Sequence, residues 1–271
     1  MEELRGKVAL VTGGAQGIGL GIARALKADG AVPVVLDLEE EPMKRAADEL
    51  SCASYALDVR DRDRWKEVVD DVESTIGPVD ILCNNAGVGG GASVTAMTYE
   101  MWDWVLDVNI GGVVNGIQTV VPRMLERGTG HVVNTASGAG LVSGGGDSGG
   151  FMYGTSKFAV VGLSENMRYD LAKRGIGMSV LCPGPVATDI ITRSETGRPV
   201  QRPLTEEQQA HTDVDFAQRT FDRQQDLLKK GVASQATDDQ AEQIVRPVDR
   251  QREGAGRLAK RGFHLGTEGS E

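Results

Sequence analysis

Short apolar runs alternate along the chain with segments whose apolar residues recur at helical spacing. The apolar runs predict strands near residues 7–12, 32–37, 53–57, 79–83, 131–136 and 177–182. The segments between them predict helices over residues 17–29, 40–50, 61–76, 99–126 and 152–174. This alternation is typical of repeated β-α-β units. We therefore expect an α/β fold in which one doubly wound domain has a parallel sheet and helices on both faces.

The residues that carry candidate chemistry cluster at the ends of these predicted strands. In doubly wound sheets, ligands bind beyond the carboxyl ends of the strands. The residues at or just past those ends are Gly13, Asp37, Asp58, Asn84, Ser137 and Pro183. The pattern therefore predicts one site along one edge of the sheet.

A glycine-rich turn, Thr12-Gly-Gly-Ala-Gln-Gly-Ile-Gly19, joins the first predicted strand to the first helix. We expect Gly13 to make the tight turn, Gly17 to let backbone approach a pyrophosphate, and Gly19 to allow the helix to pack closely on the strand. The amino terminus of the helix then offers N–H groups to the phosphates. The spacing is Gly-x-x-x-Gly-x-Gly, so the assignment depends on the strand before the turn and the helix after it. Together they predict a Rossmann-type dinucleotide site.

Asp37 ends the second predicted strand, about 20 residues beyond the turn. A carboxylate at this position can bind both ribose hydroxyls and repel a 2′-phosphate. The turn itself carries Gln16 where a positive side chain would favour the phosphate. These residues predict NAD rather than NADP as the cofactor. The alternative is that Asp37 merely begins a loop.

Tyr153 and Lys157 lie four residues apart in a predicted helix, so their side chains share one face. A phenol with a pKa of about 10 is a poor proton carrier at neutral pH. A neighbouring ammonium favours the phenolate, and we expect it to lower the pKa of Tyr153 and make it a general acid or base. The same spacing also occurs on solvated helix faces, so this prediction depends on the other motifs.

The ordered set of motifs resembles the short-chain dehydrogenase/reductase family over residues 5 to about 192. Asp58-Val59 is similar to the family's adenine contact, and Asn84-Asn-Ala-Gly87 to its fourth-strand signature. Pro183-Gly184 with Thr188 is similar to the segment that borders the nicotinamide. The residues that match the family's catalytic tetrad are Asn109, Ser137, Tyr153 and Lys157.

The resemblance implies a role for each of these side chains. Ser137 would hold the substrate oxygen, Tyr153 would exchange its proton, and Lys157 would hold the nicotinamide ribose and lower the pKa of Tyr153. Asn109 would interrupt its helix and hold a water that links Lys157 to solvent, and Thr188 would orient the carboxamide. The implied cofactor-binding residues are Gly13, Gln16, Gly17, Ile18, Gly19, Asp37, Asp58, Val59, Asn85, Ala86, Gly87, Tyr153, Lys157, Pro183, Gly184, Val186 and Thr188.

The implied activity is that of an NAD-dependent oxidoreductase, which interconverts a secondary alcohol and a ketone by hydride transfer. Residues 101–116 and 157–165 are similar to members that oxidise bulky secondary alcohols, among them bacterial Cα-dehydrogenases of lignin-type aryl ethers. We therefore expect a bulky or aromatic substrate, while steroid, sugar and small cyclic alcohols stay open. The alternative is a catalytically idle nucleotide-binding regulator or scaffold of the same fold, and the complete tetrad favours the enzyme.

Composition narrows the class of partner. A chain of 271 residues can form one NAD-binding catalytic domain, and a net charge of −10 argues against nucleic acid and anionic membranes. Three cysteines near apolar runs suit free thiols in a reducing cytoplasm, and three scattered histidines show no metal spacing. The first strand begins within a few residues of the amino terminus and no apolar run reaches about 18 residues, so we expect no signal peptide or membrane span.

Two regions depart from the family pattern. The glycine-rich loop 144–150 lengthens the spacing between Ser137 and Tyr153, and it is either a mobile rim of the substrate pocket or a solvated bulge. Ser143 and Ser148 are alternatives to Ser137, which directly follows its strand. We expect residues 188–236 to form a variable substrate-covering lobe and residues 250–271 to form a weakly ordered tail.

The long helices predicted at 99–126 and 152–174 also suggest an assembly. In the second helix a strip at helical spacing contains Phe158, Val161, Gly162, Glu165 and Tyr169. Such a strip suits close packing against a partner helix, so we expect a homotetramer, with a homodimer as second choice. Trp102 and Trp104 either touch an aromatic substrate or belong to a core or interface.

Overall fold

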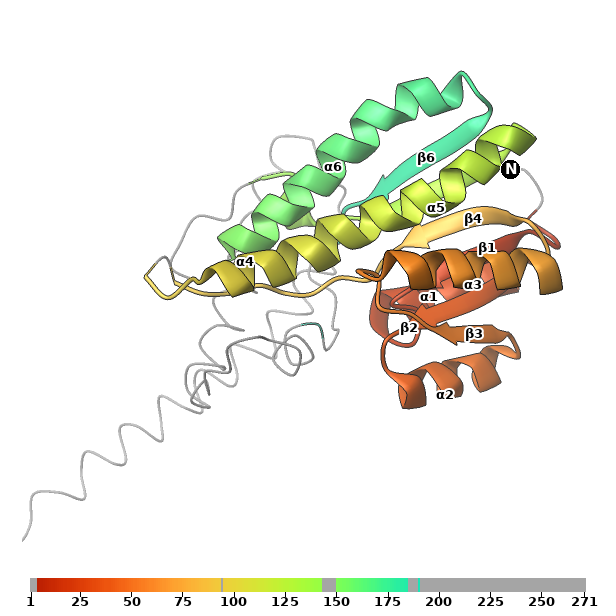
Figure 1. The fold of residues 1–271 in the computed structure, drawn as a ribbon, viewed down its shortest axis with the longest axis horizontal. Helices are drawn as coiled ribbons and strands as arrows, with labels where there is room; N and C mark the ends of the chain where they lie inside the picture. The colour runs from red at the N-terminus through yellow and green to blue at the C-terminus, as the bar shows by residue number, and fades with distance from the viewer. Residues whose placement is uncertain (1–3, 94, 143–149, 185–189, 191–271) are drawn as a thin grey trace, which may run out of the picture. The chain divides into compact units, whose positions relative to one another are not determined.

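The computed structural model describes residues 4–93, 95–142, 150–184 and 190, which belong to a compact unit spanning residues 1–201. The predicted alternation of strands and helices is confirmed (Figure 1). The strands are β1 (Val8–Thr12), β2 (Val32–Asp37), β3 (Ala53–Ala56), β4 (Val79–Asn84), β5 (Gly130–Thr135) and β6 (Ile176–Leu181). The α-helices are α1 (Gly17–Ala28), α2 (Glu40–Leu50), α3 (Arg62–Thr75), α4 (Tyr99–Leu106), α5 (Gly112–Arg127) and α6 (Phe151–Ala172).

The six strands form one sheet in the order β3-β2-β1-β4-β5-β6, and every neighbouring pair is parallel. The chain runs outward from β1 to β3, then returns to place β4 on the other side of β1. This reversal confirms the doubly wound fold and creates a switch point between β1 and β4. Ligands of such sheets bind at the carboxyl ends of the strands beside the switch point.

Strand β1 is buried on both faces, which explains its continuous apolar sequence. Val8 and Leu10 belong to a core that includes residues of α3, α5 and α6. Ala9 and Val11 alternate with them and belong to a second core that includes residues of α1 and α2. Helices therefore cover both faces of the sheet, as the sequence predicts.

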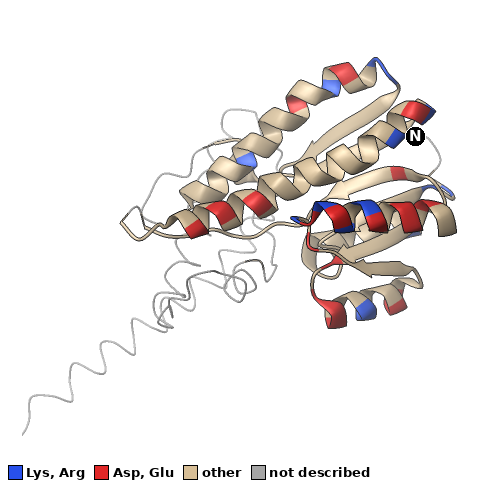
Figure 2. Ribbon diagram, viewed as in Figure 1, with Lys and Arg blue, Asp and Glu red and all other residues tan. Residues whose placement is uncertain are grey.

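Charged side chains tie α3 to α5 at the surface. Figure 2 shows acidic and basic residues interspersed along α3. Arg123 of α5 pairs with Asp70 and Glu73 of α3, and Arg127 pairs with the same Glu73. Partly exposed ion pairs of this kind each stabilise the fold only modestly, but a shared network restrains how one helix lies on the other.

A membrane span needs a long apolar helix, and the described helices include none.

A missing side chain allows α6 to approach the segment after β5. The short 3₁₀ helix Gly138–Gly140 directly follows Ser137. A Cβ atom at Gly140 would lie 2.5 Å from the carbonyl oxygen of Lys157 and 2.7 Å from its carbonyl carbon. This close approach sets the distance between Ser137 and the helix that carries Tyr153 and Lys157.

We predict that Gly140→Ala lowers the free energy of unfolding by about 1–3 kcal/mol, because the added methyl forces α6 away from the 3₁₀ helix. Gly21→Ala is the matched control, since a Cβ at Gly21 in α1 meets no atom within 4 Å. That control should raise stability by about 0.5–1 kcal/mol through helix propensity alone. Urea unfolding of both variants measures the difference, and equal effects would contradict the packing argument.

Candidate active site

The glycine turn has the geometry that the sequence predicts. Gly13 has a positive φ of 60°, and a Cβ there would lie 3.0 Å from the Cα of Ala86. A Cβ at Gly19 would overlap the carbonyl oxygen of Gly13, so only glycine lets α1 pack this closely on β1. Gln16 precedes α1 and makes no side-chain cap hydrogen bond. The amino end of α1 is thus uncapped by a side chain at the place predicted for phosphates, with Gly17 and Ile18 in its first turn.

Thr12 joins the two sides of the switch point, a role that the sequence analysis missed. Its Oγ1 accepts hydrogen bonds from the backbone N–H groups of Asn85 (2.9 Å) and Ala86 (3.0 Å). The Asn85 side chain in turn donates to the carbonyl oxygen of Thr12 at 3.1 Å. These contacts fix the segment after β4 against the glycine turn, where Gly13, Asn85 and Ala86 are predicted to contact the cofactor.

Asp37 is held rigidly at the end of β2. Its side chain is only 6% exposed, and its two carboxylate oxygens accept hydrogen bonds from the N–H groups of Ala15 (3.1 Å) and Glu39 (3.2 Å). The carboxylate therefore lies against the glycine turn rather than in a loose loop. Leu38 follows with 66% exposure, an apolar side chain on the surface beside Asp37 that the sequence analysis did not select.

The loop after β3 carries Asp58 and Val59 next to Asp37. The N–H of Leu57 donates to the Asp37 carbonyl oxygen at 2.9 Å, which fixes the start of the loop at the end of β2. Hydrogen bonds from the Arg60 side chain hold the pKa of Asp58 below its usual value. The carboxylate is therefore ionised at neutral pH.

Lys157 is buried where β4, β5 and α6 meet. It is 3% exposed, and its Nζ donates to the Thr135 carbonyl oxygen at 2.9 Å. A Cβ at Gly87 would lie 3.2 Å from both Lys157 Nζ and Asn109 Oδ1, so Gly87 separates these two polar atoms by a single small residue. Gly87, Asn109 and Lys157, which belong to separate sequence motifs, thus lie together in the structure.

Asn109 lies in a π-helical turn, Asp107–Gly111, between α4 and α5. The predicted interruption of this helix is therefore confirmed. The side chain is fully buried: Oδ1 accepts from the N–H of Val88 at 2.8 Å, and Nδ2 donates to the Val88 carbonyl and to Ser156 Oγ, both at 2.9 Å. Both N–H groups of the side-chain amide are used in positioning, while the role of Asn109 in holding a water stays a prediction.

Tyr153 follows the predicted placement but not the predicted pKa. Burial raises the pKa of Tyr153, and a hydrogen bond with the Ser137 side chain only partly offsets this. The expected lowering by Lys157 is wrong for the protein alone, because desolvation of the phenolate dominates and the ammonium donates to Thr135 instead. Lys157 Nζ lies 5.5 Å from the centre of the Tyr153 ring, and burial lowers its own pKa to about 8.

The segment after β6 lies beside Ser137. The N–H of Gly138 donates to the Pro183 carbonyl oxygen at 2.8 Å, so Pro183 and Gly184 lie at the same edge as the other predicted residues. Val186 and Thr188 lie outside the described residues, as do the alternatives Ser143 and Ser148 and most of the loop 144–150.

The two tryptophans of α4 have different surroundings. Trp104 is buried with Val105 and Met152, which assigns it to the core. Trp102 is partly buried, and its ring lies 5.8 Å from that of Phe151 in the first turn of α6. The pair joins α4 to α6 two residues before Tyr153.

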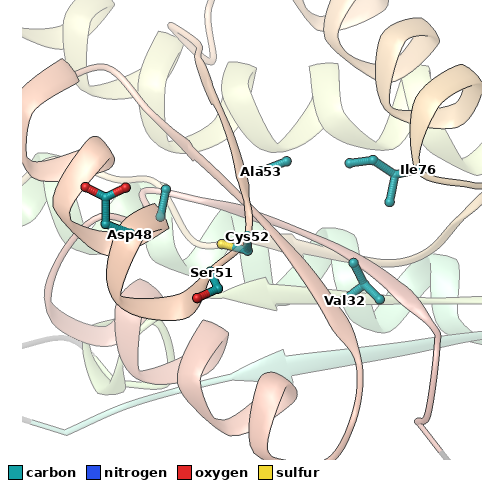
Figure 3. Close-up of a pocket in the computed structure, with 7 residues that line it drawn as sticks. Val32, Asp48, Ser51, Cys52, Ala53 and Ile76 are labelled. Atoms are coloured by element: carbon teal, nitrogen blue, oxygen red, sulfur yellow. The ribbon is translucent and has the colours of Figure 1, made fainter.

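A hollow of about 580 Å³ lies at the amino ends of β2 and β3, opposite the predicted site (Figure 3). Val32 and Ala53, which begin β2 and β3, line it together with Cys52 and Ile76. It contains none of the predicted site residues. Within the described ranges, no group of histidine, cysteine and acidic residues has the arrangement of a metal site.

Comparison with known proteins indicates the same family as the ordered motifs of the sequence. The family described as short chain dehydrogenase matches residues 7–199. The chain is 35% identical over 201 residues to a C alpha-dehydrogenase of a Sphingobium species, covering 72% of this chain and 65% of that relative. The chain thus spans less than two thirds of that relative's length. It is 38% identical over 196 residues to 3beta-hydroxysteroid dehydrogenase 2 of Eggerthella lenta, covering 69% and 74% of the two chains.

Solved structures give the same result. A short-chain dehydrogenase/reductase from Burkholderia phymatum in complex with NAD is 31% identical, with a TM-score of 0.72 and coverage of 100% and 99% of the two chains. An NAD⁺-bound xylitol dehydrogenase is 33% identical, with a TM-score of 0.62 and coverage of 68% and 72%. From the parallel sheet, the glycine turn and these matches, we conclude that the chain belongs to the short-chain dehydrogenase/reductase family.

Proposed function

We propose that the protein is an NAD-dependent oxidoreductase that interconverts a secondary alcohol and a ketone. The observation that carries this proposal is the cluster at the carboxyl edge of the sheet. There, Tyr153 interacts with Ser137, and its ring centre lies 5.5 Å from the buried ammonium of Lys157. The same edge carries the glycine turn and the fixed carboxylate of Asp37.

The residues present fit a dinucleotide. Gly13 and Gly19 let the turn and α1 pack closely against β1 and the segment after β4, and the adjacent end of α1 lacks a side-chain cap. We propose that the backbone of this turn binds the phosphates and that Asp37 binds the adenosine ribose. The nicotinamide, when bound, accepts or donates the hydride, and the protein positions the substrate beside it.

Proton transfer to or from the substrate oxygen then depends on Ser137 and Tyr153. Ser137 Oγ holds the substrate oxygen, while Tyr153 exchanges a proton with that oxygen through its phenolic Oη. Because burial raises the pKa of Tyr153, the phenol is protonated at neutral pH and is ready to donate to a ketone. For alcohol oxidation the phenol must ionise, and the positive charge of the oxidised cofactor, when bound, would favour this.

We propose a bulky or aromatic substrate. Two apolar side chains that follow Ser137 are exposed, Leu141 and Val142, so this side of the site offers apolar surface. The name of the Sphingobium relative, C alpha-dehydrogenase, supports this choice. The names of other relatives keep steroid and sugar alcohols as the next candidates.

We also propose a cytoplasmic location, because the three cysteines of the protein are free thiols, which suit a reducing compartment.

A panel of secondary alcohols with NAD tests the activity directly. We expect the near-ultraviolet absorbance of reduced nicotinamide to appear with at least one bulky benzylic, steroid or sugar alcohol. If NAD binds but no alcohol reduces it, the protein is a nucleotide-binding regulator or scaffold and the proposal is wrong.

We predict a preference for NAD over NADP, since the Asp37 carboxylate repels a 2′-phosphate. Asp37→Asn is the informative variant, because an amide keeps an oxygen for the Ala15 N–H while removing the charge. The ratio of kcat/KM for NAD to that for NADP should fall by about tenfold or more in this variant. Equal efficiency of the wild type with both cofactors would refute the prediction.

Tyr153→Phe should lower kcat by about 100-fold or more, because it removes the proton carrier. The Kd for NAD should stay within about twofold, since the ring remains. Tyr99→Phe is the matched control, because Tyr99 begins α4 with 85% exposure and loss of its hydroxyl should make no difference to turnover. Retention of more than about a tenth of the activity in Tyr153→Phe would exclude the acid/base role.

We further propose a homotetramer, with a homodimer as second choice. Apolar side chains on the outer surfaces of α5 and α6 are exposed, including Val114, Phe158 and Tyr169. Pairing of these helices between subunits would bury them. Light scattering at micromolar concentration should give a multiple of the 28.8 kDa chain mass, and a single-chain mass would contradict both assemblies.

A further inference from the structure

Asn115 is a buried polar residue that no motif selects. It lies in α5 with 8% exposure, six residues after Asn109. Its Nδ2 donates to the carbonyl oxygen of Val59 at 2.9 Å and lies 3.4 Å from that of Arg60. Gly112, one helical turn earlier, faces the same loop, since a Cβ there would lie 2.6 Å from Val59 Cγ2. This stretch of α5 is therefore shaped to contact the loop after β3.

The Val59 carbonyl has a second donor. Nε1 of Trp65, a fully buried residue of α3, donates to it at 3.0 Å. Both acceptor positions of this one oxygen are thus used by side chains from two different helices. Two side-chain hydrogen bonds therefore restrain the backbone of a loop that has no regular secondary structure.

The side chain of Asp58, which precedes Val59 in the sequence, is held in place as well. The backbone N–H of Arg60 donates to one Asp58 carboxylate oxygen at 3.0 Å, and the guanidinium of Arg60 contacts both oxygens at 2.6–3.1 Å. A carboxylate has about four lone-pair positions, and these contacts use nearly all of them, so the Asp58 side chain is held in one orientation. The loop is preorganised in both its backbone and its acidic side chain.

The position of the loop indicates what it serves. Leu57 is hydrogen-bonded to Asp37, which places Asp58 and Val59 beside the proposed ribose site and away from the glycine turn. A dinucleotide with its phosphates on the turn and its ribose at Asp37 must extend its adenine toward this loop. This step rests on the proposed function.

We propose that Asn115 is a positioning residue for the adenosine half of the cofactor. It acts through the Val59 carbonyl, which it holds in place with Trp65, and so sets where Asp58 and Val59 meet the adenine. Because Trp65 still satisfies that carbonyl when the amide is removed, loss of Asn115 frees one of two anchors and does not leave the carbonyl unpaired. The effect should therefore appear in binding rather than in folding.

The test compares Asn115→Leu, which has a similar volume, with Thr119→Val one turn further along α5. Thr119 donates to the carbonyl oxygen of Asn115 within the helix, so its variant controls for a general disturbance of α5. Calorimetry measures the Kd for NAD and for ADP-ribose, which keeps the adenosine half and lacks only the nicotinamide. Steady-state kinetics with nicotinamide mononucleotide, which lacks that half, completes the comparison. Asn115→Ala replaces Asn115→Leu if the latter fails to fold.

We expect Asn115→Leu to raise the Kd for both NAD and ADP-ribose by about tenfold, with kcat at saturating NAD within about twofold. The kcat/KM for nicotinamide mononucleotide should not change, and Thr119→Val should leave all these values within about twofold. An unchanged Kd for ADP-ribose would overturn the proposal, as would an equal loss with nicotinamide mononucleotide. If the wild type binds neither NAD nor ADP-ribose, the proposed function itself fails.

Discussion

The buried ammonium of Lys157 is the constraint on which the rest of the site depends. Removal of a charge from water is unfavourable unless polar groups compensate, and here the Thr135 carbonyl provides the hydrogen bond. The surroundings are shaped to admit this side chain. Gly140 lets the backbone of α6 approach the segment after Ser137, and Gly87 leaves room between Lys157 and Asn109. The buried cation and these two glycines thereby bring β5, α6 and the segment after β4 together with the π-helical turn.

The same burial decides the chemistry of Tyr153. A phenol removed from water resists ionisation, and the hydrogen bond with Ser137 does not reverse this. The protein alone therefore holds Tyr153 as an acid rather than as a base. In our account, the positive charge of the oxidised cofactor shifts this balance toward the phenolate when it binds.

The sequence predicted the elements well because parallel strands buried on both faces are continuous apolar runs, as in Val8–Thr12. It also placed Gly13, Asp37 and Ser137 at one edge, since the carboxyl ends of parallel strands coincide. It missed the contacts that join distant segments. Thr12 and Asn85 are 73 residues apart, and Asn115 and Val59 are 56 apart, so no local pattern reveals either pair.

The sequence also did not show which polar residues are buried. Asn134 interrupts an apolar strand, yet it is fully buried, accepting a hydrogen bond from Asn84 and donating one to Ser164. The spacing of Tyr153 and Lys157 showed that the two side chains share a helix face. It did not show that burial raises the pKa of Tyr153, which is why that pKa was predicted in the wrong direction.

The ionisation of Tyr153 tests this account most directly. The chain has four tyrosines, and the difference in phenolate absorbance between the wild type and Tyr153→Phe isolates the one at the site. Without NAD, Tyr153 should ionise only above the usual pKa of about 10. With saturating NAD, its ionisation should move to lower pH by at least about one unit. The same titration curve with and without NAD would contradict the account.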